Sequence, residues 1–293
     1  MPAHDTPAAD VLAMRKPRED EIDAYGVTHP GKVRKDNQDH YVLCSLRKQL
    51  VLRSSSIPDA AELMAESERL ASLAMVADGV GGAARGETAS RLALQGVTRY
   101  VSRATRCYFG AAEDDDHGLL EALKEGARHC HQELIRLGEE NDDYRGMATT
   151  LTLYLGVWPR GYLLQVGDSR CYLLRDGELT QITRDQTMAQ AMVDLGAMKV
   201  EEVANSRLAH TLTSSIGGSQ TDPQITRFDM TWGQVLLLCS DGLTRHVTDA
   251  RIREVLRSMT SAREACETLL QEALDDGGSD NITVVVGRAV QRG

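Results

Sequence analysis

The feature that most constrains this chain is a short apolar run that ends in an aspartate followed by glycines, Leu73-Ala-Met-Val-Ala-Asp78-Gly79-Val-Gly81-Gly82. The apolar run predicts a buried strand. The glycines allow the backbone to turn sharply and to approach a ligand closely. A carboxylate at the mouth of a buried strand, beside exposed carbonyl groups, suits a hard divalent cation, although Asp-Gly also ends many strands in an ordinary turn.

The same arrangement recurs along the chain, and this favours the metal interpretation. Apolar strands end in Asp168 and Asp241, and Asp39 and Asp280 stand just before apolar strands. Strands packed in register could bring these ends to one rim, where the carboxylates would repel one another unless a divalent metal removed the conflict. Oxygen ligands without a His/Cys set predict Mg²⁺ or Mn²⁺ rather than Zn²⁺. The alternative is a set of five independent turn aspartates.

Length and composition restrict the class of protein. A chain of 293 residues can hold one large domain or two small ones, and no linker or shift in composition divides this one. The net charge of -10 argues against general nucleic-acid binding, which favours a basic face. No apolar run is long enough to span a bilayer, and residues 1–20 lack the apolar core of a signal peptide. Six scattered cysteines without a CxxC pair fit reduced, buried thiols, so we predict a cytoplasmic protein with neither a membrane nor a nucleic-acid partner.

Hydrophobic periodicity predicts a segregated α+β fold in a single domain over residues 22–293. We expect helices over 87–101, 119–137 and 249–274, and strands over 22–28, 73–77, 148–158, 161–169, 170–175, 178–182, 234–239 and 282–286. The strands between 148 and 182 are expected to form one antiparallel meander that includes a hairpin with an Asp-Gly turn.

Three segments lie outside this pattern. Residues 1–21 contain several prolines and mixed charges, which predicts a poorly ordered tail. Residues 46–72 form an insertion with a helical pattern over 58–70. Residues 184–212 interrupt the strands with polar, helix-like sequence and are expected to leave the sheet.

The predicted site would have hydrolytic chemistry. Two hard cations with bound water lower the pKa of that water and hold a phosphoryl group between them. Arg34 stands close to Asp39 in the sequence, and an arginine fork near the metals would hold two phosphate oxygens. A lone arginine of this kind is otherwise a surface ion pair.

At this point the sequence resembles the metal-dependent (PPM-type) Ser/Thr protein phosphatases, in particular their bacterial branch. The resemblance extends from about Ala24 to Gly287 and rests on six motifs in the order of the family. These motifs are Arg34-x-x-Asn37-Gln38-Asp39, Ala77-Asp78-Gly79-Val80-Gly81-Gly82, Gly146-Met-Ala-Thr-Thr150, Gly167-Asp168-Ser169-Arg170, Ser240-Asp241-Gly242-Leu243 and Ser279-Asp280-Asn281-Ile282. The resemblance implies two antiparallel β-sheets packed as a central sandwich, flanked by helices on both faces in α-β-β-α layers.

The resemblance also implies the site. It implies a centre of two Mg²⁺ or Mn²⁺ ions, with a third ion that binds more weakly. Asp78 would bridge the two metals and their water, and the backbone carbonyl of Gly79 would bind one metal. By motif position, the remaining groups are Asp241 and Asp280 on the other metal, Asp39 as a ligand directly or through water, Gln38 through water, Asp168 on the third metal and Arg34 on the substrate phosphate.

The implied reaction is hydrolysis of phosphoserine and phosphothreonine in proteins. The metal-bridging water would attack phosphorus directly, without a phosphoenzyme. The implied partners are phosphorylated proteins, such as a bacterial Ser/Thr kinase that the enzyme opposes or the substrates of that kinase, and we favour a monomer. Residues 184–212 would be the flap beside the active site.

Two positions depart from the pattern of the family. Gln38 replaces the usual glutamate of the acidic pair, which lowers the charge of the site, although an amide can still accept a hydrogen bond from metal-bound water. Val80 stands where some members carry a histidine that donates a proton, so the group that protonates the leaving alcohol is not identified.

Two other functions stay open. A non-catalytic signalling module could use the same fold to bind partners, but such a module is expected to lose metal aspartates, and this chain retains them. A different metal-dependent phosphohydrolase could act on nucleotides or nucleic acid. The acidic charge and an aromatic content of 4% disfavour nucleic acid.

Overall fold

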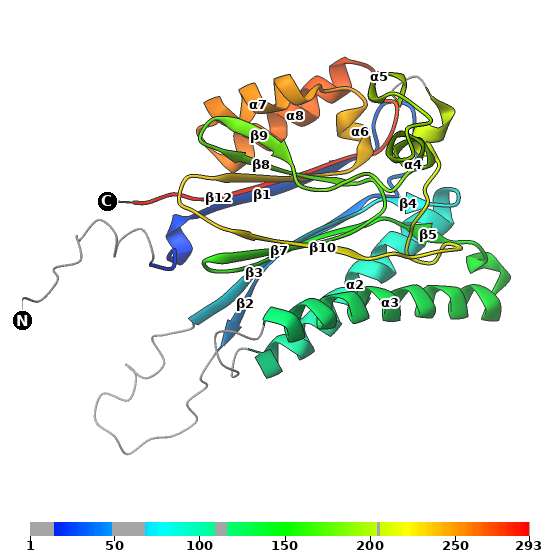
Figure 1. Cartoon of the computed structure of the whole chain (residues 1–293), viewed down its shortest axis with the longest axis horizontal. Coiled ribbons are helices and arrows are strands. Elements are labelled where there is room, and N and C mark those ends of the chain that lie inside the picture. Colours follow the sequence, from blue (N-terminus) through cyan, green and yellow to red (C-terminus); the bar gives the residue numbers. More distant parts are fainter. Residues whose placement is uncertain (1–14, 49–67, 109–115, 204–205, 293) are drawn as a thin grey trace, which may run out of the picture.

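Two antiparallel sheets pack face to face, with helices on both outer faces, in the computed structural model of the protein (Figure 1). The model describes residues 15–48, 68–108, 116–203 and 206–292. Sheet A has the strand order β1-β12-β11-β8-β9 and sheet B has the order β10-β7-β6-β3-β2, while β4 and β5 form a short separate pair. The predicted α+β sandwich in α-β-β-α layers is therefore confirmed.

The strands of the two sheets come from all parts of the chain. Sheet A contains β1 (Ile22–His29), β8 (Arg170–Arg175), β9 (Glu178–Gln181), β11 (Val235–Cys239) and β12 (Ile282–Ala289). Sheet B contains β2 (His40–Lys48), β3 (Glu68–Ala77), β6 (Leu151–Val157), β7 (Arg160–Val166) and β10 (Gln224–Asp229). The short pair is β4 (Gly79–Val80) with β5 (Ala148–Thr149).

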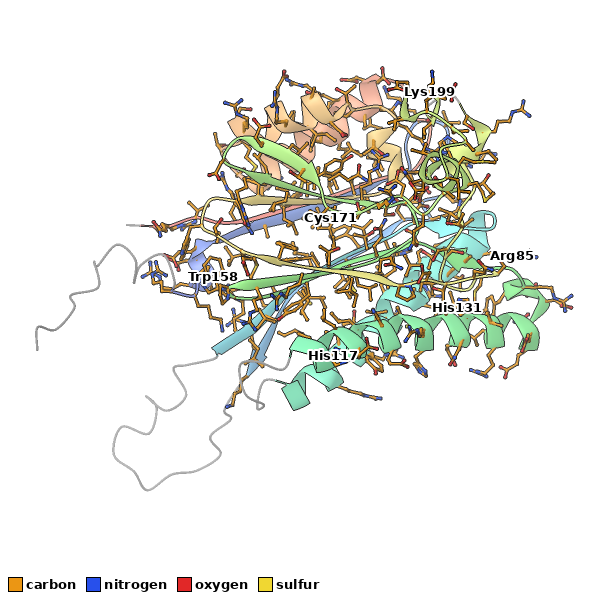
Figure 2. The ribbon with its side chains drawn as sticks, viewed as in Figure 1. Arg85, His117, His131, Trp158, Cys171 and Lys199 are labelled. Carbon is orange, nitrogen blue, oxygen red and sulfur yellow. The ribbon has the colours of Figure 1, made fainter. Side chains whose placement is uncertain are left out.

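Burial on both faces explains the continuous apolar run of β3. Leu73, Met75 and Ala77 face the helices, whereas Ala74 and Val76 face sheet A. Strand β11 repeats this division in sheet A, with Leu237 toward the helices and Leu238 toward sheet B. A strand that is buried on both faces has no polar alternation, because neither face meets water. Cys171 lies in the middle layer between the sheets (Figure 2).

The helices cover the two outer faces. Helices α2 (Ala83–Tyr108) and α3 (Asp116–Glu140) pack on sheet B. Helices α7 (Asp249–Ser258) and α8 (Ala262–Asp275) pack on sheet A. The predicted helix over 249–274 is two helices, because Ser261 caps a new one by accepting a hydrogen bond from the Glu264 amide, 3.1 Å away. Among the described residues, no helix has the length and apolar character needed to cross a membrane.

The predicted meander between 148 and 182 is wrong. Strands β6 and β7 pair in sheet B, and β8 and β9 pair in sheet A as the predicted hairpin. The chain crosses from one sheet to the other at residues 167–169, where Gly167 adopts a φ of 101° that favours glycine. This crossing carries Asp168. Strand β10, which was not predicted, adds an edge to sheet B.

Two predicted boundaries also need correction. The described part of the predicted tail, residues 15–21, is ordered and contains a 3₁₀ helix at Glu19–Glu21. The Glu21 side chain is buried there and accepts hydrogen bonds from Arg15. The predicted insertion at 46–72 begins and ends as strand, since β2 continues to Lys48 and β3 starts at Glu68. The predicted helix over 58–70 lies mostly outside the described residues.

Candidate active site

The register of the sheets gathers the five predicted acids at one rim of the sandwich. In sheet B, His40 pairs with Ala77 and Leu151 pairs with Val166. Asp39, just before β2, therefore lies at the same edge of the sheet as Asp78 and Asp168, which come just after β3 and β7. In sheet A, Cys239 pairs with both Arg170 and Val284, which places the ends that carry Asp241 and Asp280 together. This is the end of the molecule where β4, β5 and α6 lie (Figure 1). The sequence acids thus form one cluster.

Two threonines hold Asp78 in place. The Asp78 amide donates to Thr150 Oγ1 at 2.9 Å, and the Asp78 carbonyl accepts from the Thr150 amide at 2.9 Å and from Thr149 Oγ1 at 2.8 Å. Thr150 Oγ1 also lies 2.8 Å from Ser169 Oγ, which ties Asp78 to the crossing segment. These contacts give the Thr-Thr motif a positioning role that the sequence alone did not assign.

Gly79 lets the first turn of α2 approach the end of β3. A Cβ atom on Gly79 would lie 2.2 Å from the Gly86 carbonyl oxygen, so a larger residue would push the helix away. Gln38 occupies the same turn. With its amide nitrogen toward the turn, Gln38 donates to the carbonyl oxygens of Gly79 and Gly82, 3.2 Å from each. A carboxylate in this orientation would face two carbonyl oxygens, so the amide of Gln38 fits the turn better than glutamate.

Asp39 is buried, with 2% of its surface exposed. Its Oδ2 atom accepts hydrogen bonds from Ser240 Oγ at 2.6 Å and Thr283 Oγ1 at 2.7 Å. Burial raises the pKa of Asp39 to about 6, because these hydrogen bonds offset the loss of hydration only in part and the charge of Asp241 adds to it. Ser240 and Thr283 are further positioning residues that the sequence did not single out.

Asp78 and Asp168 are held together with the other acids against their mutual repulsion. Burial, and then the negative charges of the four other acids, raise the pKa of Asp78 well above its ordinary value. Burial and the charge of Asp241 do the same to the pKa of Asp168. A cluster of this kind favours either protons or a cation.

Arg34 reaches the rim from the loop between β1 and β2. Its guanidinium group binds the carboxylate of Asp280 through Nε at 2.9 Å and Nη2 at 3.0 Å, and half of its side chain is exposed. Asn281, which is buried, holds this loop by donating to the carbonyls of Pro30 and Asp36, at 3.0 and 2.9 Å. The predicted phosphate-binding group therefore lies beside the acid cluster.

Arg245 also enters the cluster, and sequence reasoning missed it. It donates to Asp241 through Nε at 3.0 Å and through Nη2, and to Asp280 through Nη1 at 3.0 Å. It follows the short helix α6 (Asp241–Thr244), four residues after Asp241. This i,i+4 spacing on a helical turn is the signal that could have identified it.

The acid cluster fits a hard divalent cation. Asp39 Oδ1 and Asp241 Oδ1 are buried and have no hydrogen-bond partner. Buried oxygens of this kind are rare in proteins and suit an ion, and the five carboxylates supply the oxygen ligands that Mg²⁺ and Mn²⁺ prefer. In the described part of the chain, no three acidic, His or Cys side chains already close around one point as metal ligands. Ion pairs to Arg34 and Arg245 hold Asp241 and Asp280 instead.

The segment 184–212 lies beside the cluster. It contains α4 (Met188–Asp194), α5 (Val200–Val203) and a 3₁₀ helix at Arg207–His210. Arg170 anchors its start by binding Asp185, with Nη2 2.7 Å from Oδ2. At its far end His210 Nδ1 lies 4.0 Å from Asp241 Oδ2. The segment therefore contacts the site directly.

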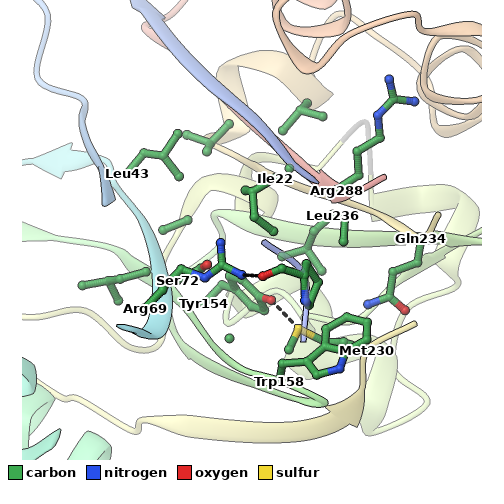
Figure 3. Close-up of a pocket in the computed structure, with 18 of the residues that line it drawn as sticks. Ile22, Leu43, Arg69, Ser72, Tyr154, Trp158, Met230, Gln234, Leu236 and Arg288 are labelled. Atoms are coloured by element: carbon green, nitrogen blue, oxygen red, sulfur yellow. Dashed lines mark hydrogen bonds between the residues drawn. The ribbon is translucent and has the colours of Figure 1, made fainter. Parts of the chain in front are cut away.

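A cavity of about 100 Å³ lies between the two sheets (Figure 3). Both sheets line it, with Leu43 and Tyr154 from sheet B and Leu236 from sheet A. Trp158, which lines this cavity, lies at the opposite end of the sandwich from Arg85 of α2 and Lys199 of the segment 184–212 (Figure 2). None of the predicted site residues borders this cavity, so it is separate from the acid cluster.

Comparison with known proteins places the chain in a family. A sequence model of the family described as protein phosphatase 2C matches residues 54–276. The serine/threonine protein phosphatase PstP of Mycobacterium tuberculosis is 37% identical over 250 residues, which cover 83% of this chain and 46% of PstP. The serine/threonine phosphatase stp of Listeria monocytogenes is 30% identical over 217 residues, which cover 73% of this chain and 83% of stp. The chain thus spans about half the length of PstP.

Solved structures agree with the sequence comparison. The crystal structure of Mycobacterium tuberculosis PstP superposes with a TM-score of 0.73 at 31% identity, over 92% of this chain and 99% of that one. A structure of the PstP catalytic domain in complex with two manganese ions superposes with a TM-score of 0.69 at 32% identity, with the same coverage of both chains. The resemblance inferred from the six motifs is confirmed: the chain belongs to the protein phosphatase 2C family, together with these bacterial Ser/Thr phosphatases.

Proposed function

We propose that this chain is a metal-dependent protein phosphatase that hydrolyses phosphoserine and phosphothreonine in proteins, opposing a bacterial Ser/Thr kinase. The observation that carries the proposal is the gathering of five carboxylates at one rim, with two buried oxygens free and Arg34 beside them. Membership of the family and the two manganese ions in the PstP complex support it. The substrates would be a kinase or its phosphorylated targets, in the cytoplasm.

The proposed metal ligands follow the arrangement of the rim. Asp78 would bridge two ions, the Gly79 carbonyl would bind one of them, and Asp241 and Asp280 would bind the other. Asp39 would complete the pair directly or through water, Gln38 would act through water, and Asp168 would bind a third, weaker ion. When bound, the two metal ions would supply a water activated as nucleophile and positive charge beside the phosphoryl oxygens.

The residues of the chain itself orient the substrate. Arg34 would exchange one oxygen of Asp280 for the phosphate oxygens, since its guanidinium fork matches either partner. Ser240 and Thr283 hold the carboxylate of Asp39, and Thr150 holds the backbone of Asp78, while this happens. Val80 is 41% exposed and carries no proton to donate, so the leaving alcohol must take its proton from another group.

The test is hydrolysis of a phosphothreonine peptide during a titration with Mn²⁺, compared with hydrolysis of a nucleotide. We expect peptide turnover that requires Mn²⁺ or Mg²⁺ and falls to background with a chelator, because water needs the metal to become a nucleophile at neutral pH. Preference for the nucleotide would favour the other phosphohydrolase. Binding of metal without turnover of either compound would favour the signalling module.

Arg34→Ala is expected to lower kcat/KM for the phosphopeptide by about 10²-fold, because two charge-assisted hydrogen bonds to phosphate are lost. Arg34→Lys should recover little of this, since an ammonium group lacks the fork. Lys35→Ala, one position away in the same exposed loop, is the matched control and should stay near wild type. Steady-state kinetics at saturating Mn²⁺ measure the effect, and a normal kcat/KM in Arg34→Ala would exclude phosphate binding by Arg34.

A further inference from the structure

The ion pairs of Arg245 occupy the oxygens on which the proposed second metal depends. Its guanidinium group binds Oδ2 of Asp241 and Oδ2 of Asp280, 3.0 Å from the latter. Arg34 also binds both oxygens of Asp280. Of the four oxygens of these two carboxylates, Asp241 Oδ1 alone has no partner among the described residues.

The position of Arg245 suits a counter-ion rather than a surface ion pair. Its side chain is 28% exposed, whereas those of Asp241 and Asp280 are 15% and 17% exposed. Its charge also interacts with Asp78 and lowers the pKa of Asp168 against the effect of burial. One guanidinium group therefore compensates part of the charge of four of the five acids. In a partly buried site, such compensation is worth more than at an open surface.

We propose that Arg245 is a resident counter-ion of the metal centre: it holds Asp241 and Asp280 in the metal-free protein, and a divalent ion must displace it to bind. This inference rests on the proposed function, because it concerns the same metal site. Arg245 and the metal compete for the same carboxylate oxygens. The affinity of the site for Mn²⁺ is therefore set in part by the strength of the arginine ion pairs.

The competition has two consequences with opposite signs. Removing the guanidinium charge leaves less positive charge beside Asp241 and Asp280, so the metal-free protein loses stability. The same change frees the oxygens and removes a positive charge from the path of the ion, so Mn²⁺ binds more tightly. A residue with a purely structural role would lower stability without strengthening metal binding.

The experiment is calorimetric titration of Mn²⁺ into metal-free wild type and Arg245→Gln, together with thermal unfolding of both. We expect Arg245→Gln to lower the Kd for Mn²⁺ by about 10-fold, as one repelling charge a few ångströms from the ion is removed. We expect the metal-free form of Arg245→Gln to unfold at a lower temperature than metal-free wild type. Saturating Mn²⁺ should raise the Tm of the variant by more than it raises the Tm of wild type. Arg245→Lys, which keeps the charge, should bind Mn²⁺ with an affinity closer to wild type.

Arg251→Gln is the matched control. Arg251 also bridges two carboxylates, Glu272 at 2.7 Å and Glu254 at 2.8 Å, but it does so on the surface of α7, away from the rim. Its replacement should leave the Kd for Mn²⁺ unchanged. Binding of Mn²⁺ to wild type with an equal or weaker affinity in Arg245→Gln would overturn the inference and leave the metal centre standing. Failure of both proteins to bind Mn²⁺ would overturn the metal centre and the inference together.

Discussion

Asp78→Asn is expected to lower kcat/KM for a phosphothreonine peptide by about 10³-fold or more. The proposed bridging position is shared by both ions, so the loss of its charge removes several kcal/mol of transition-state stabilisation. The asparagine should still fit, since Thr149 and Thr150 hold the backbone of Asp78 and an amide has nearly the same shape as a carboxylate. Steady-state kinetics over a range of Mn²⁺ concentrations measure the effect.

The same substitution should stabilise the metal-free protein. Burial and the neighbouring acids raise the pKa of Asp78, which means that its charge is unfavourable in the fold, and a neutral amide removes that cost. A variant with little activity and a higher metal-free Tm would separate the loss of function from unfolding. Asp143→Asn, which changes an exposed aspartate elsewhere, should alter neither quantity. Activity close to wild type in Asp78→Asn would contradict the assignment of Asp78 as the bridging ligand.

The contribution of Asp39 to the stability of the metal-free protein is expected to fall as the pH rises from about 4 to above 6. The pKa of Asp39 is about 6 in the fold, above its ordinary value of 3.8, so the folded protein holds a proton that the unfolded chain releases. The stability that this proton contributes is fully present below about pH 4 and is lost as the pH passes about 6. For Asp39 the difference corresponds to roughly 3 kcal/mol, a large share of the stability of an ordinary domain. The raised pKa values of Asp78 and Asp168 extend the decline to higher pH.

Saturating Mn²⁺ should reverse this decline, because an ion that binds only the folded state stabilises it by about 4 kcal/mol at 1,000 times its Kd. Urea unfolding at a series of pH values, with and without Mn²⁺, measures both effects. Asp39→Asn is the matched variant and should flatten the part of the pH profile between about 4 and 6. Profiles of the same slope in metal-free wild type and Asp39→Asn between about pH 4 and 6 would contradict a raised pKa of Asp39, and the comparison cancels the opposite effect of His40 and His131, whose pKa values burial lowers.

Local sequence patterns predicted most of the secondary structure and the acids of the candidate site. The runs that end at Asp78 and Asp241 are strands in which successive residues are all apolar, because both faces are buried. Such a run can be recognised within about ten positions of the sequence. The hairpin at Asp176-Gly177 followed from its turn residues in the same way. The resemblance of six ordered motifs then supplied the family, which the comparisons confirmed.

Local patterns failed where distant segments decide the outcome. The meander prediction was wrong because periodicity does not say which sheet a strand joins, and Gly167 carries the chain across the sandwich. Residues 15–21 read as a tail, yet Glu21 is buried against Arg15 once β1 enters sheet A. Strand β10 was missed because its residues alternate only weakly in burial at a sheet edge.

By itself, the sequence determined most of the strands, the acids at their ends and the family, since each of these is written in short runs of neighbouring residues. The tertiary structure alone decided what surrounds the acids. Ser240 and Thr283 reach Asp39 from more than 200 positions away, and Arg245 reaches Asp280 across 35. Contacts of this range depend on the register of two packed sheets, and no local spacing encodes that register.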